Sequence, residues 1–156
     1  MATNRASGDL VKLFDDLVRC ETRLYNAIGD TLREEHGIVT TQYEFLRYLR
    51  DHPGSRVAEV ATNFAAGVGA ISKGTDRLEA RGWVKRRPNP TDGRSSLVTL
   101  TAAGEALLKA AEDTFRRRLA ELVSPSLASD RVKEVGEALQ ALRVSLEENR
   151  LGVPVG

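Results

Sequence analysis

The stretch that most constrains the fold runs from residue 67 to residue 104 and reads GVGAISKGTDRLEARGWVKRRPNPTDGRSSLVTLTAAG. From about Val68 to Arg81, apolar residues such as Ile71 and Leu78 fall on one face at helical spacing. Gly82 follows where a helix C′ residue belongs, because glycine takes the left-handed conformation without strain. The pattern therefore predicts a helix that ends at about residue 81.

Two short β-type runs come next, at residues 83–87 and 96–100, and in the second Leu and Val alternate with hydroxyl residues as in a half-buried strand. The segment between them, residues 88–93, is polar and rich in turn residues. Thr101 stands where its hydroxyl could accept a free backbone N–H from the first turn of another helix. The predicted order is helix, strand, exposed turn, strand, helix.

Positive charge is concentrated in the same stretch. Residues 73–94 hold seven cations and three acidic residues, a net charge of +4 in a chain whose total is +1, whereas residues 9–35 carry a net −3. A basic helix and a basic hairpin match a DNA duplex, which offers a major groove to the helix and phosphates or a minor groove to the hairpin tip. The alternative is that these cations only solvate a surface. The seven cations are Lys73, Arg77, Arg81, Lys85, Arg86, Arg87 and Arg94.

Three motifs stand in order along this stretch: Asp76-Arg77-Leu78-Glu79-Ala80-Arg81-Gly82-Trp83-Val84, then Asp92-Gly93-Arg94, then Val98-Thr99-Leu100-Thr101 with Gly104. Together they resemble the signature of MarR-type winged-helix transcription regulators, over about a quarter of the chain. The flanking helices extend the resemblance to nearly the whole length. It implies a mainly α fold with a small two- to three-stranded β-wing, that is, a winged helix-turn-helix flanked by N- and C-terminal dimerisation helices.

The N-terminal part of the chain predicts one long helix. Residues 1–7 are small and polar and are expected to be loose, whereas residues 8–35 repeat apolar side chains at three- and four-residue steps without a proline. Such a helix would be about 40 Å long. Its apolar face is wider than one neighbouring helix would cover, which favours a partner chain.

Four further helical segments are expected. A capping-box pattern, Thr41 with Glu44, opens a short helix over residues 42–50, and another short helix covers about 57–64. After the wing come a helix over residues 102–123 and a last helix that ends near residue 150. The predicted division is 1–37, an N-terminal dimerisation helix; 38–101, a winged helix-turn-helix lobe; 102–150, C-terminal dimerisation helices; and 151–156, a tail.

In the family that the chain resembles, the terminal helices of two subunits interlock, so the resemblance implies a homodimer. The apolar residues assigned to that contact lie on the first helix and on the two after the wing. They are Leu10, Phe14, Leu17, Leu119, Leu139, Leu142 and Leu146.

Residue-by-residue matching to the family pattern gives a set of candidate DNA contacts. The start of the recognition helix has few hydrogen-bond donors, and Gly74 stands where the family usually has an apolar residue, so DNA shape and the wing are expected to carry much of the selectivity. The candidates are Val68, Gly69, Ala70, Ser72, Lys73, Arg77, Lys85, Arg86, Arg87, Asp92 and Arg94.

The strongest of these candidates is Arg94, because a guanidinium fits the negative, narrow minor groove. Asp92 is expected to hold it by a charge-assisted hydrogen bond. The alternative is that both residues only stabilise the hairpin. Arg86 and Arg87 are phosphate candidates, although either one could pair with Glu79 instead.

The resemblance also implies a small aromatic or anionic effector bound between the dimer helices and the DNA-binding lobe. Candidate effector contacts, chosen by position and chemistry, are Arg19, Arg23, Tyr43 and Arg47. The alternative is that each of them forms a salt link or caps the hydrophobic core.

Several other classes of function have little support in the sequence. The two histidines are isolated, and neither metal-ligand spacing, a catalytic triad nor a phosphate loop is present, so we expect no metal, no cofactor and no enzymatic activity. No run is long enough for a membrane span, and the single cysteine, Cys20, fits a reducing cytoplasm.

The prediction is therefore a cytoplasmic homodimer that binds a pseudo-palindromic duplex and responds to a ligand, most often as a repressor. Two alternatives stay open. One is a repressor that senses oxidants through the thiol of Cys20. The other is a winged-helix module that binds an acidic protein partner through its basic face.

Overall fold

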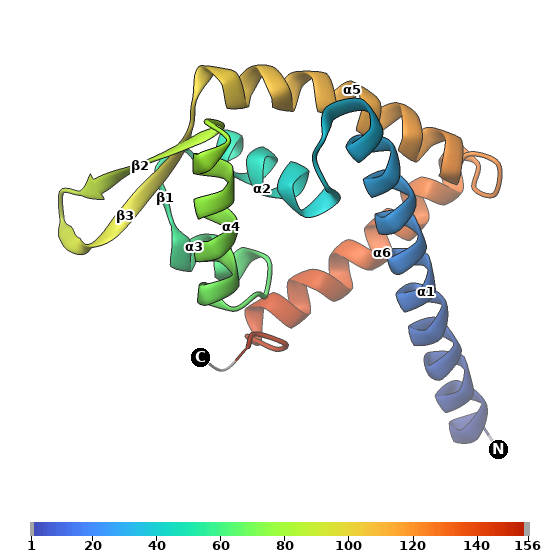
Figure 1. Cartoon of the computed structure of the whole chain (residues 1–156). Coiled ribbons are helices and arrows are strands. Elements are labelled where there is room, and N and C mark those ends of the chain that lie inside the picture. Colours follow the sequence, from blue (N-terminus) through green and yellow to red (C-terminus); the bar gives the residue numbers. More distant parts are fainter. Residues whose placement is uncertain (1, 155–156) are drawn as a thin grey trace.

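The computed structural model describes residues 2–154, and it is mainly helical with one small antiparallel sheet (Figure 1). Helices flank the sheet on both sides in sequence, which confirms the predicted fold class. The elements in order are α1 (Ala2–His36), α2 (Thr40–Asp51), β1 (Ser55–Arg56), α3 (Val57–Asn63), α4 (Val68–Ala80), β2 (Val84–Asn89), β3 (Asp92–Leu100), α5 (Ala102–Val123) and α6 (Ser129–Glu148).

The core lies where α2, α4 and the sheet meet the end of α1 and the start of α5. α2 lies beneath α5, and α5 also packs along the C-terminal part of α1 (Figure 1). Tyr43 of α2 is buried and stacks on Phe115 of α5, with ring centroids 4.5 Å apart. The other large core side chains are Ile28, Leu32, Ile38, Phe45, Leu46, Leu49, Val60, Leu78, Val84, Val98 and Leu108.

The sheet has the strand order β1–β3–β2, with both pairs antiparallel. Gly82, between α4 and β2, has φ +77°, so the predicted left-handed glycine is confirmed. Thr101 caps α5 as predicted, since its hydroxyl accepts the N–H of Gly104 at 3.1 Å. These two residues fix the ends of the wing relative to the helices that precede and follow it.

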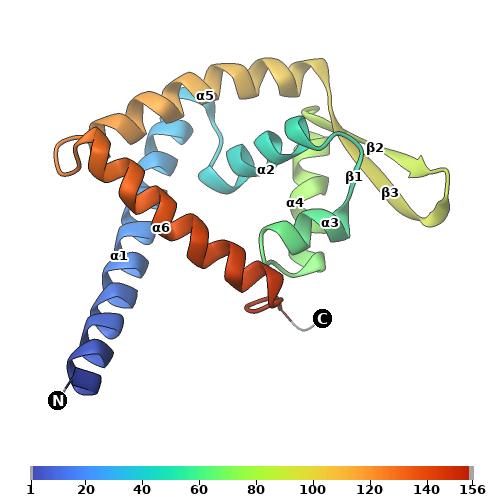
Figure 2. The same ribbon diagram turned by 180° about the vertical axis from the view of Figure 1, so that it is seen from behind.

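The N-terminal part of α1 extends away from this core, whereas α6 doubles back from the end of α5 across α1 and runs below α2 (Figures 1 and 2). None of the residues of α6 belongs to the core. Every residue from 128 to 150 is exposed, although α6 carries a regular apolar stripe. On α1, Leu10 and Phe14 are 66% and 65% exposed. Among the residues that the structure describes, therefore, none covers these two apolar faces.

Two sequence predictions at helix starts were wrong, and one short strand was not located. α1 begins at Ala2 rather than at Gly8, because nothing before Gly8 breaks a helix, while residue 1 lies outside the described part. α2 starts earlier than expected, with Val39 as its N-cap in place of the predicted Thr41. The side chain of Gln42, and not that of Glu44, accepts the N–H of this capping residue at 3.0 Å. β1 was not predicted, since two residues are too few for a recognisable pattern.

The wing is longer and its turn is tighter than the sequence indicated. Strands extend to Asn89 and from Asp92, so only Pro90 and Thr91 form the connection. The prediction had assigned Pro88 to the turn, but this residue lies inside β2. Proline is tolerated there because β2 is an edge strand, where half of the backbone N–H groups need no partner.

Candidate nucleic-acid interface

The first half of α4 is an exposed helix end. Gly67 precedes it in an extended conformation, and no acidic residue lies in its first turn. Val68 is 55% exposed, while Gly69 and Ala70 are also open to solvent. Free backbone N–H groups at such an end favour an anion such as phosphate, and the small side chains allow close approach. Ser72 is half-buried and Lys73 is exposed.

Most cations of α4 and the wing are free of acidic partners. Six of the seven are exposed and form no ion pair with any residue in the described range 2–154: Lys73, Arg77, Arg81, Lys85, Arg87 and Arg94. Arg81 lies over the ring of Trp83, 4.2 Å from its centroid. The face formed by α4 and the wing therefore has an uncompensated positive charge, as a polyanion-binding surface requires.

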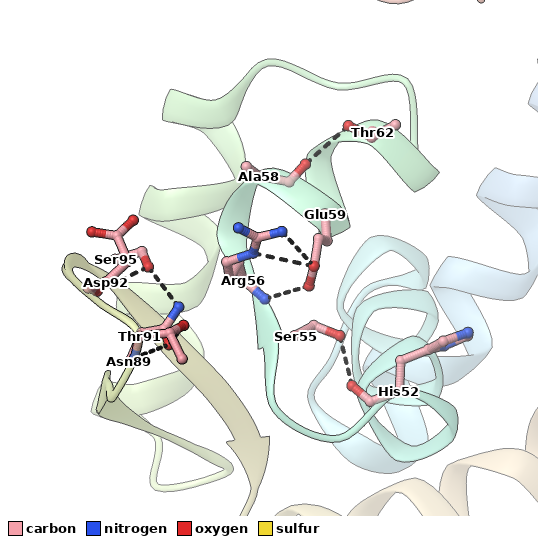
Figure 3. A network of polar contacts seen from close by, with 10 residues as sticks. All are labelled: His52, Ser55, Arg56, Ala58, Glu59, Thr62, Asn89, Thr91, Asp92 and Ser95. Carbon is pink, nitrogen blue, oxygen red and sulfur yellow. Dashed lines mark hydrogen bonds and ion pairs between the residues drawn. The ribbon is translucent and has the colours of Figure 1, made fainter.

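The tip of the wing is organised by Asn89, a residue that the sequence analysis did not single out (Figure 3). Its side chain is buried, accepts the N–H of Thr91 at 3.1 Å and the hydroxyl of Thr91 at 2.9 Å, and donates to the hydroxyl of Ser95 at 3.0 Å. One amide thus ties both ends of the two-residue turn together. The Asn89-Pro90 pair was the available signal, because Asn-Pro favours the start of a turn.

Asp92 supports Arg94 differently from the prediction. Its carboxylate accepts the backbone N–H of Arg94 at 3.0 Å, and it makes no ion pair with the guanidinium. The predicted charge-assisted bond to the side chain was therefore wrong. The reason is local geometry, since an Asp two residues earlier readily accepts a backbone N–H in an Asx-type turn. The Arg94 side chain stays exposed at the tip.

Arg86 and Arg87 have different surroundings. Arg86 is partly shielded and forms ion pairs with Asp76 and with Glu79, so the internal pairing that the sequence left open is present for this residue. Arg87 is exposed and has no acidic partner among the described residues. Of the two phosphate candidates on β2, Arg87 is the available one.

The segment that leads into α3 is held by a second polar network (Figure 3). The carboxylate of Glu59 accepts the backbone N–H of Arg56 at 2.8 Å and pairs with its guanidinium at 2.9 Å. The backbone bond, followed by the side-chain bonds, lowers the pKa of Glu59 from its ordinary value. Ser55 donates to the carbonyl of His52 at 2.6 Å. These bonds fix β1 and the start of α3 beside the wing.

A cavity of about 410 Å³ lies between α1, α2 and α4. Its walls are mostly apolar, with Phe45, Phe64 and Ile71 among them, and Arg77 and Glu44 supply charge. Burial, followed by the Glu44 carboxylate, raises the pKa of the Tyr25 phenol, which lies in the wall of the cavity. The cavity can accommodate a small molecule with an apolar body and one or two polar groups.

The four candidate effector residues do not line this cavity. Arg19 pairs with Asp15 at 3.5 Å on α1, and Arg23 is exposed. Tyr43 belongs to the core, and Arg47 lies over its ring while pairing with Glu44 at 3.0 Å. For Arg19, Tyr43 and Arg47 the structure thus matches the alternative of salt links and core capping.

Three other observations concern the rest of the described chain. Cys20 is a free, exposed thiol on α1. Within residues 2–154, His, Cys, Asp and Glu side chains form no group of three or more that could hold a metal ion. The described helices include none that is long and apolar enough to cross a membrane.

An exposed helix start, a tandem of short helices before it and a basic two-stranded wing after it define a winged helix-turn-helix protein. The MarR family model matches residues 38–96. The chain is 34% identical to the HTH-type transcriptional regulator YxaD of Bacillus subtilis, over 65% of this chain and 71% of that protein. It is 33% identical to the HTH-type transcriptional repressor NicR of Pseudomonas putida, over 80% of this chain and 78% of that protein.

The fold also matches Sco3205, a MarR family transcriptional regulator from Streptomyces coelicolor solved in complex with DNA. The TM-score is 0.83 at 22% identity, over 94% of this chain and 93% of that one. The chain therefore belongs to the MarR family of transcriptional regulators, which are DNA-binding proteins and not enzymes.

Proposed function

We propose that this protein is a homodimeric, ligand-responsive repressor that binds a pseudo-palindromic DNA site. The observation that carries the proposal is the exposed start of α4 beside a wing whose tip presents Arg94, with six cations that lack acidic partners among the described residues. In this arrangement α4 enters the major groove, with Val68, Gly69, Ala70, Ser72 and Lys73 as its base-facing positions. Arg94 enters the adjacent minor groove.

Dimerisation is supported by the uncovered apolar faces of α1 and α6. Leu139, Leu142 and Leu146 are each about 40% exposed along α6, on the side that also faces Leu17 of α1 across a shallow apolar hollow. Contiguous apolar surface of this kind marks an interaction site. A second copy supplies the matching surface, because a two-fold interface is self-complementary and a two-fold DNA site requires two recognition helices.

Repression is supported by relatives such as NicR that are named as repressors. Ligand response is supported by the cavity beneath α4, since an occupant there would contact Ile71 and Arg77 of the recognition helix. A ligand that binds better to one orientation of α4 than to another shifts the population between them, and thereby changes the affinity for DNA.

Gly74 offers a direct test of the cavity's role. It lines the cavity, and a Cβ at this position would meet no atom within 4 Å. Gly74→Leu therefore fills part of the cavity without a backbone clash. We expect the variant to keep DNA binding and to lose the response to any compound that releases the wild-type protein from its site. A response of unchanged size would contradict the assignment.

The experiment that tests the whole proposal is selection of duplexes from a random pool by the purified protein. We expect recovery of an inverted repeat whose half-sites lie about one helical turn apart, bound by two chains, with affinity that falls steeply as salt rises. Recovery of no preferred sequence, or binding by a single chain, would contradict it. Strong binding to an acidic protein without binding to any duplex would favour the protein-interaction alternative.

A further inference from the structure

The inference concerns Arg86, which lies on β2 but makes its contacts on α4. Its backbone N–H donates to the carboxylate of Glu79 at 3.0 Å. Its guanidinium donates to the carboxylate of Asp76, lies 3.5 Å from the other oxygen of Glu79, and donates to the backbone carbonyl of Ser72 at 3.2 Å. One residue of the wing is thus bonded to three residues of the recognition helix.

The three acceptors form one stripe of α4. Ser72, Asp76 and Glu79 follow each other at steps of four and three residues, so they lie on the same face of the helix. A guanidinium presents five N–H donors in a rigid plane and can satisfy several acceptors at once, whereas an ammonium group cannot bond them in a fixed geometry. The Arg86 side chain is only 23% exposed, and partial shielding from water strengthens these contacts.

The neighbours of Arg86 on β2 point the other way. Side chains alternate between the two faces of a strand, and Lys85 and Arg87 are exposed without acidic partners among the described residues. Arg86 is paired in the ladder with Val98 of β3, which is fully buried. Arg86 therefore connects a strand anchored in the core to one face of α4. That face lies next to the side of α4 that is proposed to read DNA.

We propose that Arg86 is a positioning residue that fixes the angle between the recognition helix and the wing, and that it is not a phosphate contact. Its charge is already balanced by Asp76 and Glu79, so it has little left to offer to DNA. Its bond to the carbonyl of Ser72 reaches the part of α4 proposed to face the bases. Without Arg86, α4 and the tip carrying Arg94 keep their own structures but lose their fixed separation.

This inference rests on the proposed DNA-binding function, and the test separates the two. Three variants are compared with the wild type: Arg86→Met, which keeps the length of the side chain and removes its charge; Arg87→Met, the matched control one residue away; and Asp76→Asn, which weakens the same contact from the helix side. Hydrogen exchange of wing amides, residues 84–100, is measured without DNA. Affinities are then measured over a range of salt for the duplex selected by the wild-type protein and for a scrambled duplex of equal composition.

We expect Arg86→Met to speed exchange in the wing and to lower the ratio of selected to scrambled affinity by about tenfold, the value of one good base contact. The salt dependence of scrambled-duplex binding stays as in the wild type. Asp76→Asn lowers the ratio in the same direction. Arg87→Met keeps the ratio and reduces the slope of log affinity against log salt by about one, as the loss of a phosphate contact does.

Two results would overturn the inference: a loss of salt slope in Arg86→Met equal to that in Arg87→Met, or wing exchange unchanged in Arg86→Met. If the wild-type protein itself prefers no duplex, the proposed function fails. The exchange measurement still decides whether Arg86 holds the wing to α4, because it needs no DNA.

Discussion

At the scale of single residues, Arg94 is the side chain whose role is simplest to isolate. Its backbone N–H donates to Asp92, while its guanidinium is exposed and is not packed into the fold. We expect Arg94→Met to weaken binding to the selected duplex by about tenfold or more, because a cation in the narrow minor groove is lost. Electrophoretic mobility shift at moderate salt measures this, with oligomeric state checked by light scattering.

The matched control is Lys109→Met, which removes an exposed cation of α5 that forms no ion pair with the described residues. This control should bind like the wild type. Equal affinities for the Arg94 variant and the wild type would remove Arg94 from the interface.

Gly104 is the position where the addition of a single methyl group should lower the stability of the fold most. A Cβ there would lie 2.0 Å from the carbonyl oxygen of Trp83, and that oxygen also accepts the N–H of Thr101 at 3.0 Å. The start of α5 or the end of the wing must therefore move. We expect Gly104→Ala to destabilise the fold by roughly 1–3 kcal/mol in denaturant unfolding. Gly74→Ala, at an open helical position, should instead stabilise the fold slightly. Equal free energies of unfolding for the two variants would mean that the contact between residue 104 and the Trp83 carbonyl does not affect stability.

Single residues also mark the limit of what the sequence predicts. Gly82 and Thr101 were identified from local patterns, because a left-handed turn and a helix cap depend on neighbours in the chain. Asn89 and the pairing of Arg86 with Asp76 were not identified as such. The pairing of Arg86 depends on how a strand folds back onto a helix ten residues earlier, which no local pattern encodes. Asn89 bonds within the hairpin, and its local signal, the Asn-Pro pair, was not used.

At the scale of elements, α1 and α5 are joined by a polar cluster at the end of α1. The hydroxyl of Thr114 donates to the carboxylate of Glu35 at 2.6 Å and lies 2.8 Å from the Nε2 atom of His36, while Arg117 pairs with the other oxygen of Glu35. The bond from Thr114, followed by that from Arg117, lowers the pKa of Glu35. The joint holds the long helix in a fixed direction relative to the DNA-binding lobe.

A depressed carboxyl pKa gives this joint a defined pH dependence. The Glu35 carboxylate stabilises the folded state above its unfolded-state pKa, and that contribution is lost as the pH falls through the lower folded-state pKa. We expect Glu35→Gln to have a lower melting temperature than the wild type at neutral pH. The difference should shrink as the solution is acidified below the ordinary carboxyl range. A difference that stayed constant from neutral to acidic pH would show that the ionised carboxylate is not the stabilising group.

The elements differ in how far the sequence predicted them. The bounds of α4 and α5 agree with the prediction to within a residue, because glycine, a threonine cap and apolar spacing are local signals. β1 was missed because it exists only by pairing with β3. The resemblance implied an effector site between the dimer helices and the DNA-binding lobe, but the residues that line the cavity were not predicted, because its walls come from three helices. Only Gly74, where the family usually has an apolar residue, hinted at open space.

At the scale of the whole molecule, charge and apolar surface are segregated. The basic face lies on α4 and the wing, whereas the N-terminal part of α1 extends from the opposite side (Figure 1) and belongs to a stretch with net negative charge. The uncovered apolar residues lie on α1 and α6. In the proposed dimer, such an arrangement would keep the contact between the two copies away from DNA and leave both basic faces free to bind one duplex.

Leu142→Asp tests this organisation. Leu142 is 44% exposed on the apolar stripe of α6, and it lines the shallow hollow between α6 and Leu17. A carboxylate there would be buried in the proposed dimer without a partner, which is strongly unfavourable. We expect the variant to stay folded, because α6 contributes no side chain to the core of its own chain, and to sediment as a monomer at micromolar concentration. Its affinity for the selected duplex should fall by roughly a hundredfold or more, since one half-site must then be bound alone.

The control for this variant is Ala141→Asp, which adds the same charge one position earlier, on a part of the helix turned away from the stripe. It should remain a dimer and bind the duplex like the wild type. Because both variants lower the net charge equally, simple repulsion from DNA would weaken both. Only loss of the dimer weakens the Leu142 variant alone, so a Leu142→Asp protein that stayed dimeric would mean that the two copies associate through another surface.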